Sequence, residues 1–269
     1  CDQEIYRVID KHEKEGILID NFWLASGYTS GEEDNLRYVF NWNHRRFPDP
    51  AGFFAKMNAM GINVIPNLKP GILKNHPYMP LFEKNDVFIK NPDGDGDYYG
   101  RWWGGEGRFF DFTGEKGRNT WKDLLKKNVL ELGVKTVWND NCEMDGVEDR
   151  NAQCDFEGEK GTMAELKILH SNLMAYVGKQ ALAEVYPANV PTSSTVRVLR
   201  VSSGTPRSGA ATTSPTGAPS SSTSPPSWAW ACPAAPTWAA TSAALRAALP
   251  KRNCCCAGSR AVSSSPGSA

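Results

Sequence analysis

The sequence predicts an α/β fold class: a partial (β/α)8 TIM barrel over residues 1–187, followed by a low-complexity tail over residues 188–269 that does not look native. Helical and apolar segments alternate three times in the first part, which implies parallel strands with right-handed crossovers. Each apolar segment ends in small or polar residues, as barrel strands do at their catalytic ends. The chain length per unit favours a barrel over a doubly wound sheet, although periodicity alone leaves both open.

The first predicted unit is a helix followed by a strand. Ile5 and Ile9 fall on one face of a helix that ends at Gly16. The apolar residues at 17–24 then predict a buried strand, and the small residues at 25–27 leave space at its end for another group.

The second predicted unit repeats this order. Pro50 after the capping residue Asp49 begins a helix, and Gly61 closes it. Residues 62–72 follow as a strand. We therefore expect this strand to lie parallel to the first.

The third predicted unit begins with a helix over residues 118–133 and continues into a strand that opens at Val134. The inner face of this helix is predicted to consist of Trp121, Leu124, Leu125 and Val129. An acidic loop then leads to a long amphipathic helix over residues 162–187. If the strands are parallel, the residues that follow them, at 27–28, 67–70 and 138–140, lie at one end of the barrel.

Charge divides the chain into two unlike parts. All 30 Asp and Glu residues precede residue 188, whereas the tail holds six Arg and one Lys among Ser, Ala, Pro and Thr. The first part has the composition of an ordinary acidic enzyme, and the tail resembles neither a core-forming domain nor a charged linker. No apolar run reaches membrane-spanning length and no targeting signal is visible, so we expect a soluble protein away from membranes, with the cytoplasm slightly favoured.

Other kinds of site find no support in the spacing. The acidic stretch at 141–149 lacks the Glu of an EF-hand, and residues 91–100 predict a turn. The seven Cys form no disulfide framework and no zinc spacing, so no metal and no cofactor is expected. His170 lies beside Leu169 and Leu173 in a predicted helix, which favours a packed histidine over a ligand. Without a phosphate loop or basic stripe in the first part, no nucleic acid partner is expected.

Five blocks of residues 1–187 resemble, in order, successive blocks of glycoside hydrolase family 31, the α-glucosidase and α-xylosidase group. They are "FNWNHRRFPDP", "NVIPNLKPGI", "GRWWGGEGRFFDFT", "VWNDNCEMDG" and "ILHSNLMAYVGKQALAEVYP". In this family a Trp, one residue and the catalytic Asp end the fourth barrel strand, which is the pattern of Trp138 and Asp140. The resemblance implies a catalytic barrel of which about strands two to four are present, with an α-linked oligosaccharide or glycoside as substrate.

The resemblance also implies roles for individual residues. Asp140 would be the nucleophile that forms a covalent glycosyl-enzyme, and its partner, the acid/base carboxyl group, is absent from this chain. Glu143 would support the site by hydrogen bonding. The remaining predicted substrate-binding residues are Trp138, Trp102 and Trp103, which would stack on sugar rings, and Arg101, Lys69 and Asp111, which would bind hydroxyls or orient the nucleophile. Core packing and solvated charge are the alternatives for these six.

Two departures from the family limit what can be carried over. Residues 25–28 read Ala-Ser-Gly-Tyr where many members place Asp residues that hold the terminal sugar, so sugar and linkage specificity are not implied. The tail lacks the Trp-Ser-Gly-Asp block that carries the acid/base. Shifted by one base, the codons of Cys254, Cys255 and Cys256 can spell three leucines, and those of residues 209–213 can spell Trp-Ser-Gly-Asp-Asn.

We therefore predict that residues 188–269 are a frameshifted translation without ordered structure, and that this chain is an inactive fragment of a retaining α-glycosidase, most simply an α-glucosidase. One alternative is an α-transglucosylase of the same family, in which a sugar hydroxyl replaces water. Another is a non-catalytic carbohydrate-binding protein that keeps the aromatic face. A genuine Ser/Pro-rich linker used in a structural interaction is the alternative for the tail. The sequence does not predict the oligomeric state.

Overall fold

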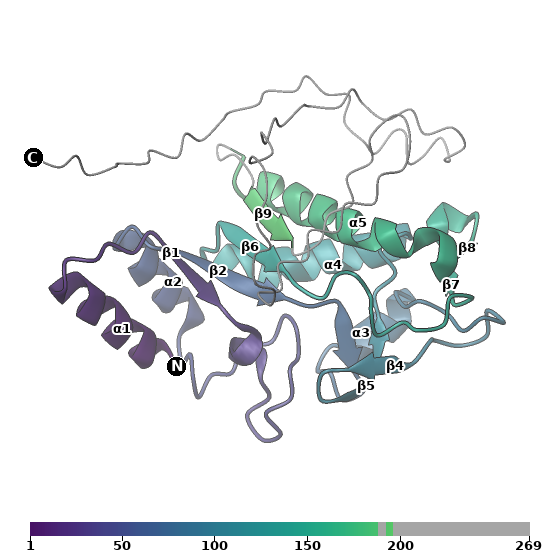
Figure 1. Ribbon diagram of the computed structural model, residues 1–269, viewed down its shortest axis with the longest axis horizontal. Coiled ribbons are helices and arrows are strands. Elements are labelled where there is room, and N and C mark those ends of the chain that lie inside the picture. Colours follow the sequence, from purple (N-terminus) through teal and green to yellow (C-terminus); the bar gives the residue numbers. More distant parts are fainter. Residues whose placement is uncertain (188–191, 196–269) are drawn as a thin grey trace, which may run out of the picture. The chain divides into compact units, whose positions relative to one another are not determined.

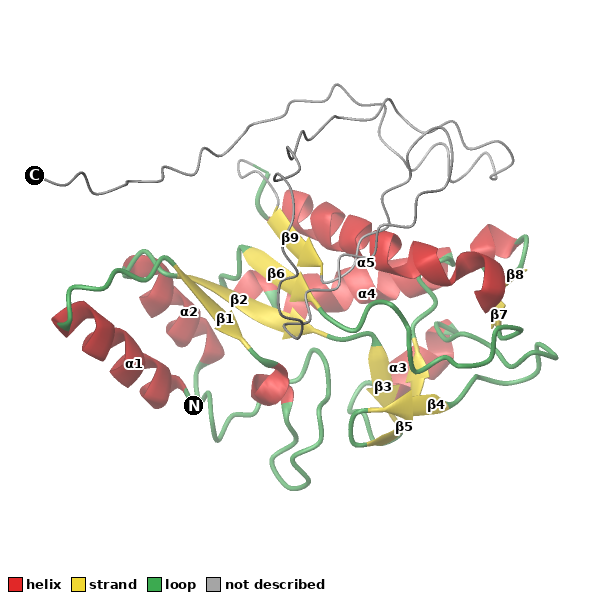
Figure 2. Cartoon of the chain, viewed as in Figure 1, coloured by secondary structure: helices red, strands yellow, loops and turns green. Residues whose placement is uncertain are grey.

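The computed structural model describes residues 1–187 and 192–195, and its elements are drawn in Figures 1 and 2. The helices are α1 (Asp2–Lys14), α2 (Pro50–Ala59), α3 (Met79–Asn85), α4 (Glu115–Asn128) and α5 (Met163–Val185). The strands are β1 (Asn21–Leu24), β2 (Asn63–Leu68), β3 (Gly71–Leu73), β4 (Gly100–Trp102), β5 (Gly105–Phe109), β6 (Thr136–Asn139), β7 (Gln153–Cys154), β8 (Gly161–Thr162) and β9 (Thr192–Thr195).

Four parallel strands form the main sheet, in the order β1-β2-β6-β9. The order of the strands in space follows their order in the chain, whereas a doubly wound sheet reverses direction at a switch point. Helices α4 and α5 pack against each other, and α5 also packs against β6 (Figure 1). The described residues therefore contain four of the eight strands that a closed TIM barrel needs. Three of them lie within the predicted barrel at 1–187, and the fourth, β9, lies in the tail.

Only β9 represents the predicted tail in this sheet. The whole tail was expected to lack ordered structure, but its residues 192–195 form this strand and pair in parallel with β6. The rest of the tail lies outside the described residues, so its frameshifted origin and lack of order stay predictions.

The first predicted strand is shorter and more exposed than expected. Residues 17–24 were expected to be buried, but β1 begins at Asn21, and Ile17 and Leu18 are 54% and 90% exposed. Ile17 is still bonded to the last turn of α1, because its N–H donates to the His12 carbonyl at 2.8 Å. The chain therefore becomes extended only after these two residues. Within the described sheet β1 is an edge strand that pairs only with β2, so Trp23 remains 51% exposed.

The second unit agrees with its sequence pattern at the helix and differs at the strand. The Asp49 side chain accepts a hydrogen bond from the Gly52 N–H at 2.9 Å, which caps α2 as expected. The predicted strand over residues 62–72 is divided into β2 and β3. Pro70 lies between them, and β3 leaves the main sheet to pair with β5 in a small antiparallel sheet of order β3-β5-β4.

The core is built around the inner face of α4. Trp121 is fully buried, and its ring lies 4.6 Å from that of Phe40 and 5.1 Å from those of Phe110 and Phe112, measured between centroids. Edge-to-face contacts of this kind stabilise a core beyond the burial of apolar area. The aromatic cluster therefore joins α4 to the residues that follow β5 and to the loop that contains Phe40.

A buried histidine in this core makes stability depend on pH. His76 is 3% exposed, its Nε2 lies 2.9 Å from the Val39 carbonyl oxygen, and its Nδ1 accepts a hydrogen bond from the Tyr78 N–H at 3.1 Å. Burial lowers the pKa of His76 to about 4. Protonation would place a hydrogen on Nδ1, where the Tyr78 N–H already points.

The unfolded chain therefore binds a proton at His76 before the folded chain does, and stability is lost as pH falls below the ordinary His pKa of about 6.5. We expect the free energy of unfolding to fall by roughly 2 kcal/mol from this residue between pH 7.5 and pH 5. Urea unfolding at both pH values measures this loss. The His76→Gln variant, which keeps polar groups but does not titrate, should lose this part of the pH dependence, and an unchanged dependence would contradict the prediction.

Candidate active site

The ends of the first three parallel strands meet at one group of hydrogen bonds. The Tyr28 hydroxyl, just after β1, donates to the Asn67 carbonyl in β2 at 2.8 Å. The Asn67 side-chain amide donates to Asp140 Oδ2 at 3.0 Å, and the Asp140 N–H donates to the Leu68 carbonyl at 2.8 Å. The prediction that residues 27–28, 67–70 and 138–140 lie at one end of the sheet is therefore confirmed.

Lys69 holds the Asp140 carboxylate from the second strand. Its ammonium forms an ion pair with Oδ2 and lies 2.5 Å from Asn141 Oδ1. The side chains of Lys69 and Asp140 are 15% and 19% exposed, so the pair is mostly screened from water and still reachable by a ligand. The other carboxylate oxygen, Oδ1, accepts from the Asn141 N–H at 2.9 Å. Donors on both oxygens fix the orientation of this carboxylate.

Two of the predicted tryptophans lie beside residues that bond to this carboxylate. The Trp103 indole N–H donates to Asn141 Oδ1 at 3.1 Å, although the ring itself is 62% exposed. Trp102 packs over Gly71, where an added Cβ would come 2.2 Å from the ring. A small cavity beside the site is lined by Ser26, Thr29, Arg37, Val39, Asn67, Lys69, Gly71 and Trp102. Trp102 thus shares a cavity with two residues that bond to Asp140.

Trp138 lies on the same side of the sheet as Asp140. Side chains alternate along a strand, so Trp138 and Asp140 project to one face. Trp138 is paired with Asn67, and its ring meets that of Trp23 edge to face at 5.4 Å between centroids. The strands therefore present two aromatic rings and one carboxylate on a single face.

Three further predicted site residues lie outside this group of hydrogen bonds among the described residues. Arg101 is exposed on β4 and lines a shallow pocket with Tyr98 and Glu148. Asp111 is buried and bonds to its own loop and to the Asp155 N–H. Glu143 has one carboxylate oxygen, Oε2, that is buried without a hydrogen-bond partner among the described residues.

The structure also gives roles to residues that the sequence analysis did not assign to the site, although Asn67 belongs to the predicted strand end at 67–70. Asn67 and Asn141 bond to Asp140, and Arg37 lines the cavity beside it. A polar residue at the end of a parallel strand is the signal that could have marked Asn67. Arg37 comes from a loop without regular structure, and no sequence pattern places it here. Within the part of the chain that the structure describes, no helix combines the length and apolar character that crossing a membrane requires.

Comparison with known families identifies the family to which this barrel belongs. The family described as "Glycosyl hydrolases family 31 TIM-barrel domain" matches residues 1–217, which includes all of the predicted barrel and extends into the tail. The chain belongs to glycoside hydrolase family 31. Its described strands are therefore part of that family's TIM barrel, and the resemblance drawn from the five sequence blocks is confirmed.

Individual members of family 31 are similar to this chain over part of their length. Alpha-glucosidase 2 of Bacillus thermoamyloliquefaciens is 29% identical over 141 residues, which cover 52% of this chain and 17% of the relative. Alpha-xylosidase XylQ of Lactiplantibacillus pentosus is 27% identical over 148 residues, covering 55% and 19%. The chain thus spans less than a fifth of the length of these relatives.

Solved structures of family 31 share the fold. A dextranase of Flavobacterium johnsoniae superposes with a TM-score of 0.61 at 20% identity, over 73% of this chain and 24% of the dextranase. An α-xylosidase from a soil metagenome gives the same TM-score at 17% identity, over 72% and 28%. At these identities the likeness concerns the fold alone.

Proposed function

We propose that the whole protein is a retaining α-glycosidase, most simply an α-glucosidase, in which Asp140 is the nucleophile. The observation that carries the proposal is the Asp140 carboxylate just after β6, held by Lys69 and Asn67. These two residues line, together with Trp102, a small cavity of about 10 Å³. A carboxylate at the carboxyl end of a barrel strand is where family 31 chemistry belongs. The α-glucosidases and the α-xylosidase among its relatives support α-linked glycosides as the substrate class.

In the proposed mechanism an Asp140 oxygen attacks the anomeric carbon while the bond to the leaving oxygen breaks. A second carboxylic acid protonates that oxygen, and the carboxylate formed then removes a proton from water, which cleaves the glycosyl-Asp ester. The described residues offer no second carboxylate in contact with Asp140. We propose that this acid/base group is missing because the reading frame shifts after Pro187, so that this chain is inactive in hydrolysis. Sequencing the encoding DNA around codons 187 and 188 tests the shift, since an uninterrupted natural frame would exclude it.

A ring-fluorinated α-glucosyl fluoride tests the nucleophile. Fluoride leaves without protonation, so the first step needs Asp140 and not the acid, and the slowed second step lets the ester accumulate. We expect one adduct per chain on the peptide that contains Asp140, in the protein with its reading frame restored. A folded protein that gives no adduct would contradict the proposal and favour a non-catalytic carbohydrate-binding protein.

Lys69 has a testable positioning role in the same assay. Lys69→Met removes the ion pair and frees the Asp140 side chain to rotate, and a misplacement of about 1 Å costs roughly 10²-fold in rate. We therefore expect labelling of Asp140 to slow by roughly 10²-fold, with the site of labelling unchanged. Lys74→Met is the matched control, because Lys74 is exposed nearby on the chain. Equal labelling rates in the two variants would contradict the role of Lys69.

A further inference from the structure

Three side chains that can bind metal ions meet in the core, away from Asp140. Asp111 follows β5, Cys154 ends β7, and His170 lies in α5, and they are 5%, 2% and 0% exposed. One ligand atom from each lies within 4.8 Å of the other two. The mechanism proposed above uses none of the three.

Asp111 is held in place by its own surroundings. Its Oδ1 accepts from the Thr113 N–H at 2.9 Å and from the Thr113 hydroxyl at 2.5 Å, and its Oδ2 accepts from the Asp155 N–H at 2.6 Å. An ionised carboxylate has about four lone-pair sites, so these bonds leave capacity for one more partner. Outer hydrogen bonds that orient a ligating carboxylate are typical of metal sites in proteins.

The side chains of Cys154 and His170 approach each other in the core. The distance between Cys154 Sγ and His170 Nε2 is 3.7 Å, which is a weak contact for a thiol. His170 Nδ1 is buried and has no hydrogen-bond partner among the described residues. The nitrogen that faces Cys154, and that would bind a metal at this place, is the other one, Nε2, so an ion bound there leaves the surroundings of Nδ1 unchanged.

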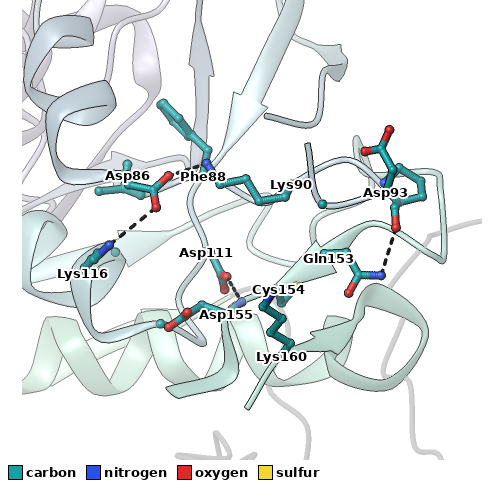
Figure 3. A pocket seen from close by; sticks show the side chains of 15 residues that line it. Asp86, Phe88, Lys90, Asp93, Asp111, Lys116, Gln153, Cys154, Asp155 and Lys160 are labelled. Carbon is teal, nitrogen blue, oxygen red and sulfur yellow. Dashed lines mark hydrogen bonds and ion pairs between the residues drawn. The ribbon is translucent and has the colours of Figure 1, made fainter. Parts of the chain in front are cut away.

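A cavity reaches this group of residues. It has a volume of about 490 Å³, and Asp111 and Cys154 line it together with Gln153 and Asp155. Figure 3 shows Asp111, Cys154 and Asp155 gathered at one place in this cavity. His170 does not line the cavity and completes the group from α5. An ion could therefore enter from the cavity and meet the two lining ligands first.

We propose that Asp111, Cys154 and His170 bind a divalent transition-metal ion, with Zn²⁺ as the best match. Tetrahedral zinc, with bonds of about 2.3 Å to sulfur and about 2.0–2.1 Å to nitrogen, separates the two ligand atoms by about 3.6 Å. The separation of 3.7 Å between Cys154 Sγ and His170 Nε2 fits this geometry. One sulfur and one nitrogen ligand favour zinc over Ca²⁺ and Mg²⁺, which take oxygen ligands. The fourth position opens toward the cavity, where water or a small anion completes the coordination.

The bound ion would tie three separate parts of the chain together. Asp111 lies in the loop before α4, Cys154 lies in the hairpin of β7 and β8, and His170 lies in α5. A metal that binds only the folded chain stabilises it in proportion to the logarithm of its concentration. The site is thus a structural link between the loop after β5, the hairpin and α5.

Cobalt titration tests the site without any measurement of activity. The protein to be titrated is the full chain without an affinity tag. Its four tail cysteines, Cys232, Cys254, Cys255 and Cys256, are replaced by serine so that their thiols do not bind cobalt. We expect one equivalent of Co²⁺ to bind with a thiolate-to-cobalt charge-transfer band and tetrahedral visible bands, and Zn²⁺ to displace it. The melting temperature should rise with the concentration of free Zn²⁺.

Substitutions then assign the ligands. Cys154→Ser and His170→Gln should each weaken Co²⁺ binding by roughly 100-fold or more, since each removes a direct ligand. Cys142→Ser is the matched control, because Cys142 is also a buried free thiol and should keep full binding. No charge-transfer band in the parent protein would overturn the proposal, whether or not the variants fold. Retention of the band in a Cys154→Ser variant that keeps its near-ultraviolet circular dichroism would also overturn it.

Discussion

Replacing Asp140 with Asn is expected to abolish covalent labelling by the α-glucosyl fluoride and to lower turnover in the frame-restored protein by about 10⁴-fold or more. The neutral amide is a poor nucleophile, while it keeps the size of the side chain and can still bond to Lys69 and Asn67. The loss should therefore appear in kcat and in kcat/KM alike, with little change in stability. Hydrolysis of an aryl α-glucoside and intact-protein mass spectrometry measure both effects.

The matched control is Asp145→Asn. Asp145 lies in the same loop, its side chain is 68% exposed, and it pairs only with Lys167 at 3.5 Å among the described residues. This variant should keep labelling and turnover. A further variant, Asp140→Gly, leaves space for azide to attack from the same face, and a β-glycosyl azide product would identify the missing carboxylate as the nucleophile. Normal labelling of the Asp140→Asn protein would instead place the nucleophile elsewhere.

The second large effect concerns stability. Trp121→Ala removes a fully buried indole that meets the rings of Phe40, Phe110 and Phe112. Lost burial and the cavity left behind should cost roughly 3–5 kcal/mol in the free energy of unfolding. Because native domains are stable by only about 5–15 kcal/mol, this change consumes much of the stability of even a complete barrel.

Urea unfolding of the frame-restored protein measures this cost. Trp103→Ala is the control, since its ring is 62% exposed and an exposed position usually changes stability by less than about 0.5 kcal/mol. Trp121→Ala with a loss below about 1 kcal/mol would show that the aromatic cluster around α4 does not hold the core together.

The parts of the fold that follow local rules were predictable from the sequence. The spacing of Trp121, Leu124 and Leu125 gives the inner face of α4, and all three are buried. Val129, the fourth residue of the predicted face, is also buried, but it follows the helix, which ends at Asn128 and not at residue 133. The cap formed by Asp49 and Pro50 correctly begins α2. Both features depend on side chains only a few positions apart, which is the range over which sequence patterns act.

The exposure of a strand and its pairing depend on segments far away in the chain, and these were not predictable from the local sequence. Ile17 and Leu18 have the composition of a strand, but their exposure depends on which strand lies beside β1. The separate antiparallel sheet arises because β3 pairs with β5, which lies much later in the chain. Burial and pairing are properties of the whole sheet, so a single segment does not encode them.

The candidate site shows the same division. Trp138 and Asp140 were found because one short motif contains both. The bond from Asn67 to Asp140 joins residues 73 positions apart, and no motif contains both. The approach of Asp111, Cys154 and His170 is likewise invisible to zinc-spacing rules, which require ligands close together in sequence. A histidine that the sequence assigns to packing is thus placed beside a thiol and a carboxylate by three separate elements.

The pairing of β2 with β6 has a consequence for how errors in folding would act. Asn67 stands opposite Trp138, and Leu68 opposite Asn139. Neighbouring side chains of a strand point in opposite directions, so a slip of β6 by a single residue would turn Asp140 away from Lys69 and toward the helices. Such a misaligned sheet could still bury many apolar groups and remain compact. The misaligned chain would then lack the candidate site while it stayed compact. The correct register of β6 is therefore a separate requirement from the stability of the sheet.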